Sequence, residues 1–182
     1  MIQSLLRPGA CLFLVVVLAS CGKQPLEAAV EKNDRTAVSE AVKSGADVNA
    51  VVSNGDTPLL LATKTGQSSS AQALIEAGAD IKVRDDAGNG VLHYAAQTGM
   101  TGICGLLIDR GNTIDEKGAG GATPLQFAVL AARQETANFL VRRGASLEQK
   151  NDASMSALDI VARSGDTRFK NDLELAAKMR GN

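Results

Sequence analysis

The chain has 182 residues, of which 45 % are hydrophobic and only 3 % aromatic, and its formal net charge is −1. This size suits one domain, and its apolar content is enough for a core built from Leu, Ile, Val and Ala rather than from aromatic rings. The near-neutral charge argues against a nucleic-acid partner, which would require a concentrated basic surface.

The first twenty residues have the pattern of a secretory signal peptide, with Arg7 as the positive start. The apolar run at residues 11–18 (CLFLVVVL) is too short to span a bilayer as a stable helix. The tetrapeptide Leu-Ala-Ser-Cys at residues 18–21 follows at the right distance and resembles the bacterial lipobox, in which the cysteine is lipidated and becomes the first mature residue. We therefore expect residues 1–20 to be removed; a plain cleaved signal and a short membrane anchor are the alternatives.

The lipobox resemblance implies three acyl chains on Cys21 and a membrane-anchored protein that faces the periplasm. Because Gly22 rather than an aspartate follows the cysteine, the resemblance favours the outer membrane. Cys11 would leave with the signal, so Cys104 is the one remaining thiol and cannot form an internal disulfide. We expect Cys104 to be a small buried core residue.

Two short sequence motifs recur every 33 residues through the rest of the chain. The first is Gly-Ala-Asp-Val-Asn at 45–49, with related segments at 78–82, 111–115 and 144–148. The second is Thr-Pro-Leu at 57–59, with related segments at 90–92, 123–125 and 156–158. A period of this length indicates a stack of small units, each of which buries the apolar face of its neighbour. The units are predicted at 22–54, 55–87, 88–120, 121–153 and, as a shorter C-terminal cap, 154–182.

Each unit is predicted to be a helix–loop–helix element. Thr57 can cap the first helix through its hydroxyl oxygen, and Pro58 suits the first helical position, where an N–H group is not needed. Glycine tolerates the left-handed conformation that ends a helix. On this basis the first helices end at Gly66, Gly99 and Gly165, and the second helices end at Gly45, Gly78, Gly111 and Gly144. The fold class is therefore all-α, a solenoid of about five units.

These motifs resemble the ankyrin repeat. Gly-x-Thr-Pro-Leu-x-x-Ala occurs at 55–62 and 121–128, and Leu-His-Tyr-Ala-Ala at 92–96. The resemblance implies a stack of antiparallel helix pairs with protruding hairpin-like loops. The histidine of the motif remains only as His93, and Gly102 and Gly105 fall inside a predicted helix, where each glycine costs about 0.5–1 kcal/mol relative to alanine. The third unit is therefore expected to be the least stable part of the stack.

The sequence offers little chemistry. His93 is the only histidine, and the resemblance implies that it forms a structural hydrogen bond within its repeat turn. The acidic segment 85–90 (DDAGNG) lacks the ligand spacing of a calcium loop, and the glycines at 118–121 (GAGG) lack the Lys-Ser/Thr of a phosphate loop. We interpret both segments as loop tips, the second as a flexible one. No enzyme activity, cofactor, metal site or small-molecule substrate is expected.

Ankyrin stacks usually bind other proteins through their loop tips and the exposed face of their first helices. Projecting the repeat register onto this chain gives candidate partner-binding residues, which are Val52, Asn54, Asp56, Arg84, Asp86, Asn89, Lys117, Leu130, Asp152 and Met155. The apolar members of this set are the strongest hint of an interface, because polar residues would suffice on a solvated surface.

The resulting hypothesis is a non-enzymatic, lipid-anchored protein that binds another protein in the periplasm. The leading function is an immunity protein that neutralises a toxic envelope-targeting effector, for example a lipid-degrading one. The alternative is an adaptor or chaperone for a periplasmic enzyme or envelope complex, including one in oxidative-stress defence.

Overall fold

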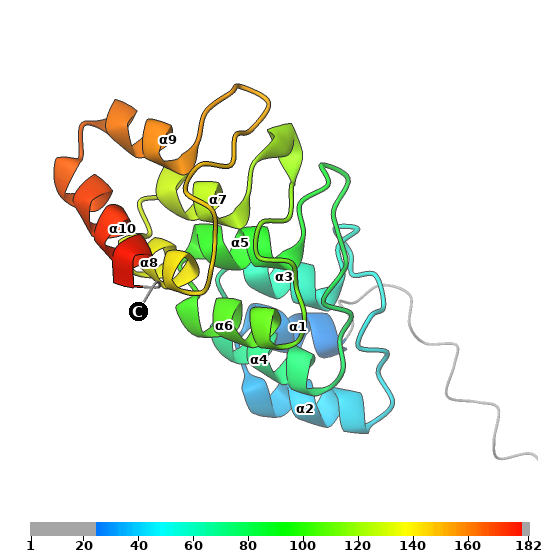
Figure 1. The fold of residues 1–182 in the computed structure, drawn as a ribbon. Helices are drawn as coiled ribbons and strands as arrows, with labels where there is room; N and C mark the ends of the chain where they lie inside the picture. The colour runs from blue at the N-terminus through cyan, green and yellow to red at the C-terminus, as the bar shows by residue number, and fades with distance from the viewer. Residues whose placement is uncertain (1–24, 180–182) are drawn as a thin grey trace, which may run out of the picture.

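The structure is a computed structural model that describes residues 25–179, and the helices of this part pair off in chain order (Figure 1). The pairs are α1 (Pro25–Glu31) with α2 (Arg35–Lys43), α3 (Pro58–Lys64) with α4 (Ser68–Glu76), α5 (Val91–Thr98) with α6 (Thr101–Asp109), α7 (Pro124–Leu130) with α8 (Gln134–Arg142), and α9 (Ala157–Ser164) with α10 (Thr167–Met179). The described residues contain no strand, only a single bridge between Arg84 and Gly90. The predicted all-helical stack of pairs is confirmed, whereas the predicted signal peptide (1–20) and the lipidated Cys21 lie outside the described residues.

The helices form two layers. The first helices of the pairs, α1, α3, α5, α7 and α9, pack side by side, and the second helices pack behind them, as in the contacts of α2 with α4 and of α8 with α10. The loops that join one pair to the next project together to one side of the stack (Figure 1). In the part of the chain that the structure describes, none of the helices is long and apolar enough to cross a membrane.

The predicted signals for helix starts are confirmed. The Thr57 Oγ1 atom accepts a hydrogen bond from the Leu60 N–H at 3.4 Å, and Pro58 opens α3. Thr123 caps α7 in the same way through the Gln126 N–H at 3.3 Å. These caps satisfy backbone donors that no helical carbonyl can reach.

Glycine in the left-handed conformation ends some of the first helices, but not all of them. Gly99 and Gly165 have φ values of 82° and 75°, as expected for left-handed helix ends. The first and fourth units have no glycine at this point, and Asn33 and Ala132 take the left-handed conformation instead, with φ values of 53° and 54°. Ala132 is the more costly choice, because a non-glycine residue without a polar side chain rarely adopts this region.

The core lies between the two helical layers and repeats with the sequence. Leu74, Leu107 and Leu140 of the second helices are completely buried, one period apart. Each fully buried leucine stabilises the fold by about 1.5–3 kcal/mol relative to an exposed one. Cys104 is buried among these residues as predicted, and its burial raises the pKa of the thiol to about 12.

The two glycines of α6 have different surroundings. A Cβ atom at Gly105 would lie 3.1 Å from the Phe139 Cζ atom, so the glycine gives the Phe139 ring of α8 room to pack. A Cβ atom at Gly102 would meet nothing within 4 Å. Gly102 therefore has no packing role, and its predicted cost to the third unit stays a prediction.

Candidate protein-binding surface

The loops that connect the helix pairs are held together by hydrogen bonds that run from the base of one loop to the base of the next. The Asn49 Oδ1 atom accepts from the Asp80 N–H at 2.8 Å, and the Asp115 Oδ1 atom accepts from the Ser146 N–H at 3.0 Å. Each bond spans about one period of the sequence, and contacts such as that of Arg84 with the Lys117 carbonyl join successive tips, so the loops form one braced row.

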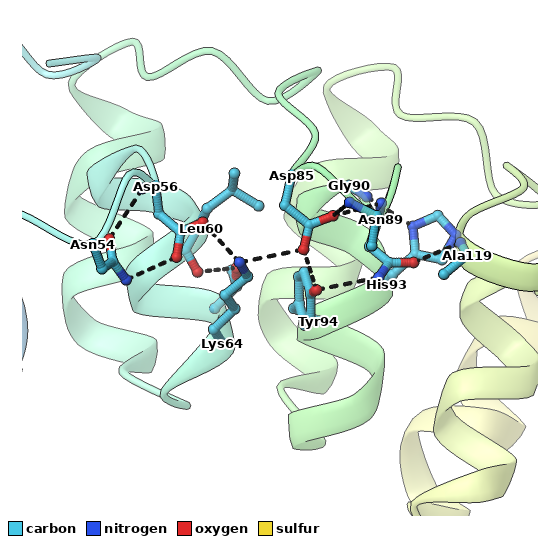
Figure 2. A network of polar contacts seen from close by, with 12 residues as sticks. Asn54, Asp56, Leu60, Lys64, Asp85, Asn89, Gly90, His93, Tyr94 and Ala119 are labelled. Atoms are coloured by element: carbon cyan, nitrogen blue, oxygen red, sulfur yellow. Dashed lines mark hydrogen bonds and ion pairs between the residues drawn. The ribbon is translucent and has the colours of Figure 1, made fainter. Parts of the chain in front are cut away.

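A polar network connects the second and third units on this face (Figure 2). The Lys64 Nζ atom lies between two carboxylates, 2.7 Å from Asp56 Oδ1 and 3.2 Å from Asp85 Oδ2. It also lies 5.0 Å from the centre of the Tyr94 ring, a favourable cation–π distance. The Asn54 amide donates to the far oxygen of Asp56 at 2.9 Å and completes this end of the network.

Asp85 and Asn89 carry the network on to the loop that precedes the fourth unit. The Tyr94 hydroxyl donates to Asp85, and the Asn89 amide donates to the Tyr94 oxygen at 3.2 Å. The Asn89 Oδ1 atom in turn accepts from the Ala119 N–H at 2.8 Å. A side chain of the third unit thus holds the next loop tip in place.

The charges in this network are stable near neutral pH. Partial burial alone would lower the pKa of Lys64, but the hydrogen bonds to Asp56 and Asp85 outweigh burial and raise this pKa above its usual value. Burial would raise the pKa of Asp85, but hydrogen bonds from Tyr94, the Asn89 backbone and Lys64 together lower it. The ion pair therefore persists across the physiological range.

His93 is a structural residue, in agreement with the role that the ankyrin resemblance implied. Its Nδ1 atom accepts from the Gly90 N–H at 3.1 Å, and its Nε2 atom, placed as the donor, lies 3.0 Å from the Glu116 carbonyl oxygen. The side chain is completely buried, and burial lowers the pKa of the imidazole below 6.5. The ring is neutral at physiological pH and joins its helix to the next loop.

The glycine-rich tip at 118–121 is pinned, although we expected it to be flexible. A Cβ atom at Gly118 would lie 2.4 Å from Asn89 Oδ1 and 2.8 Å from His93 Nε2, which is too close for any side chain. Glycine is therefore needed here because the loop backbone approaches two buried side chains from the start of the same unit.

The predicted partner-binding residues fall into two groups. The exposed group consists of Asn54, Arg84, Asp86, Lys117, Leu130 and Asp152, with Met155 half-buried. The expected exposure is wrong for Val52, Asp56 and Asn89, which are only 7 %, 8 % and 6 % exposed. Val52 packs into the core, whereas Asp56 and Asn89 turn inward to bind Lys64 and Tyr94.

Some exposed residues of the set also brace the loops. Arg84 forms an ion pair with Glu116, and its guanidinium donates to the Lys117 carbonyl oxygen at 3.0 Å. Lys117 in turn donates to the Lys150 carbonyl oxygen at 3.3 Å. Leu130 is different, because it is a large apolar side chain at the end of α7 and is 65 % exposed.

Two aromatic residues on this face, Tyr94 and Phe127, are not among the predicted partner-binding residues. Tyr94 and Phe127 occupy the same position one period apart, and their ring centres lie 6.5 Å apart in an edge-to-face arrangement. Leu61 and Ile160 hold this position in the flanking units. The signal was present in the sequence, since two of the chain's few aromatic residues are separated by one period.

A groove of about 810 Å³ lies between the first two loops that connect the helix pairs, and it is lined in part by Val51, Asn54, Lys64, Arg84 and Asp86. Val51 is 67 % exposed there, beside the carboxylate of Asp86. Within residues 25–179 no group of three or more His, Cys, Asp or Glu side chains could hold a metal ion. The geometry of this face suits contact with another macromolecule.

The comparison with protein families agrees with this geometry. A family model described as ankyrin repeats (3 copies) matches residues 1–85 and 80–151, so the chain belongs to the ankyrin repeat family. No curated protein matches the chain. Ankyrin repeats are protein–protein interaction modules and are generally non-enzymatic.

Proposed function

We propose that this member of the ankyrin repeat family is a lipid-anchored immunity protein that binds and neutralises a toxic effector at the periplasmic face of the bacterial outer membrane. The observation that carries the binding role is the braced row of loop tips. Because hydrogen bonds such as Asn89–Ala119 already fix the tips, a partner need not order them, and less conformational entropy is lost on binding.

Leu130 supplies the apolar contact of this surface. It is 65 % exposed on α7, about one helical turn after the half-buried Phe127. Leu130 ends α7, so it lies on the face of the first helices, and the polar loop tips lie beyond the other end of that helix. Apolar contacts together with polar groups at the edge are the usual composition of an interface.

The proposed location follows from the short distance between the anchor and the repeats. Helix α1 begins at Pro25, four residues after Cys21, and four residues span at most about 14 Å. More than one acyl chain makes anchoring stable. The first repeat would therefore lie close to the membrane, where a lipid-degrading effector acts.

The binding role is tested by capture from cell envelopes with a matched pair of variants. Leu130→Asp places a charge on the proposed face, and Leu175→Asp places the same charge on α10, where Leu175 is 56 % exposed in the other layer. We expect the first variant to lose its partner and the second to retain it. Equal capture by both variants would contradict the proposed face.

The immunity role is tested in cells. Deletion of the gene should be harmful only when the partner effector is active, and expression of the chain should restore survival. If deletion instead abolishes the activity of the captured partner, the chain is an adaptor or chaperone for that partner, and the immunity proposal is wrong.

A further inference from the structure

Two cations that occupy equivalent positions have different counter-groups. Lys64 ends α3 and Arg163 lies near the end of α9, three periods later in the sequence. Each side chain reaches back eight residues: the Lys64 ammonium lies 2.7 Å from the Asp56 carboxylate, whereas the Arg163 guanidinium lies 2.9 Å from the Met155 sulfur. A weakly accepting thioether thus stands where the second unit has a full negative charge.

Neighbouring units do not supply the missing charge. Lys64 receives a second carboxylate from Asp85 of the following loop, and Arg84 receives one from Glu116. Among residues 25–179, neither Arg163 nor Lys150, which follows Lys117 by one period, has a carboxylate within ion-pair distance.

Asp159 is the acidic side chain that lines the same groove, and one oxygen of its carboxylate is engaged by Ser156. The Oδ2 atom accepts from the Ser156 N–H at 2.9 Å and from the Ser156 hydroxyl at 2.8 Å. These bonds cap α9, and they are the main reason that the pKa of Asp159 is lowered. Lys150 and Arg163, which line the same groove, lower that pKa to a lesser degree.

The two cations line a groove of about 620 Å³ between the last loop tip and α9, together with Met155, Ala153 and Ala162. Leu130 stands one period before Arg163, so it holds the equivalent position on the neighbouring helix α7, where it is exposed. The groove therefore offers positive charge beside apolar area.

We propose that this groove binds an acidic side chain of the partner protein, with the carboxylate between Lys150 and Arg163 and an adjacent apolar residue on Met155 and Leu130. The proposal rests on the protein-binding role proposed above and adds the chemistry of the partner segment. A protein segment suits the site better than a free anion, because the apolar surface would otherwise be unused. It also suits the site better than a lipid headgroup, because α9 lies at the opposite end of the stack from α1, which follows the anchor (Figure 1).

The test uses the second unit as a template. Met155→Asp gives Arg163 the internal carboxylate that Asp56 gives Lys64, and Arg163→Gln removes the cation. Arg142→Gln, on the exposed side of α8, is the control for net charge. A random peptide library displayed on phage is selected against the full chain, and the enriched peptides are then titrated against each variant.

We expect the enriched peptides to contain an aspartate or glutamate next to an apolar residue. Their affinity should fall about tenfold or more in Met155→Asp and Arg163→Gln, the effect of losing one charge-assisted contact, and should be unchanged in Arg142→Gln. Circular dichroism of each variant confirms folding, and Arg163→Gln, an exposed substitution, serves alone if Met155→Asp does not fold.

Three results would overturn the inference. Peptides without acidic residues, or peptides whose affinity ignores both variants, would place the partner elsewhere on the face while leaving the protein-binding role intact. Binding of inorganic phosphate, or of vesicles that contain phosphatidylglycerol, that is lost in Arg163→Gln would assign the groove to phosphate groups. Failure to enrich any peptide, together with failure to capture any envelope protein, would count against the protein-binding role itself.

Discussion

Replacement of Asn112 by alanine is expected to stabilise the protein. Asn112 is only 6 % exposed, and neither its amide nitrogen nor its amide oxygen has a hydrogen-bond partner in the protein. The other units have alanine at this position, as Ala46, Ala79 and Ala145. The backbone is the same in each case: the Asn112 N–H donates to the Leu107 carbonyl oxygen at 3.0 Å, as the Ala79 N–H does to that of Leu74 at 2.9 Å.

The magnitude follows from the balance of two terms. Burying an unsatisfied amide costs about 1–3 kcal/mol, and the lost contacts of the removed atoms offset part of the gain. We expect the free energy of unfolding to rise by about 1–2 kcal/mol, which raises Tm by about 2–8 °C for a chain of this size.

The measurement is thermal and urea unfolding of the wild type and Asn112→Ala, followed by circular dichroism. The reciprocal change, Ala79→Asn, is the matched variant and should lower Tm, because it places the same amide in an equivalent buried position. An unchanged or lower Tm in Asn112→Ala would show that ordered water satisfies the amide, and would refute the reasoning.

Three other substitutions test the fold and the anchor. Leu107→Asp should unfold the stack, because it buries an unpaired carboxylate at a completely buried position at a cost of several kcal/mol; a cooperative melt at the wild-type temperature would contradict this. Stability should fall as pH drops below 6.5, because the pKa of folded His93 is lowered and the unfolded chain then binds more protons. His93→Gln should keep the fold and flatten this part of the pH profile, since Gln126 makes equivalent bonds to the Gln149 and Met155 carbonyl oxygens; an equally steep profile, measured by urea unfolding at several pH values, would exclude His93 as the cause. Cys21→Ala should move the chain from the membrane fraction to the soluble fraction without loss of partner binding, and unchanged fractionation would argue against lipidation.

The sequence by itself determined the helix pairs and their boundaries. Thr57 with Pro58 starts a helix and Gly99 ends one, because caps and left-handed residues act within a few positions of the chain. The 33-residue period then placed leucines such as Leu107 in the core, since equivalent positions in a stack have equivalent neighbours.

Only the tertiary structure decided which loop residues face the partner. Asp56 and Asn89 have the polarity and register of surface residues, yet both are buried, because Lys64 and the Ala119 N–H from other segments need their oxygens. Only the structure likewise shows that the Arg163 guanidinium contacts the Met155 sulfur rather than a carboxylate. Side-chain direction in a loop depends on groups that neighbouring units bring close, and no local rule of the sequence contains that information.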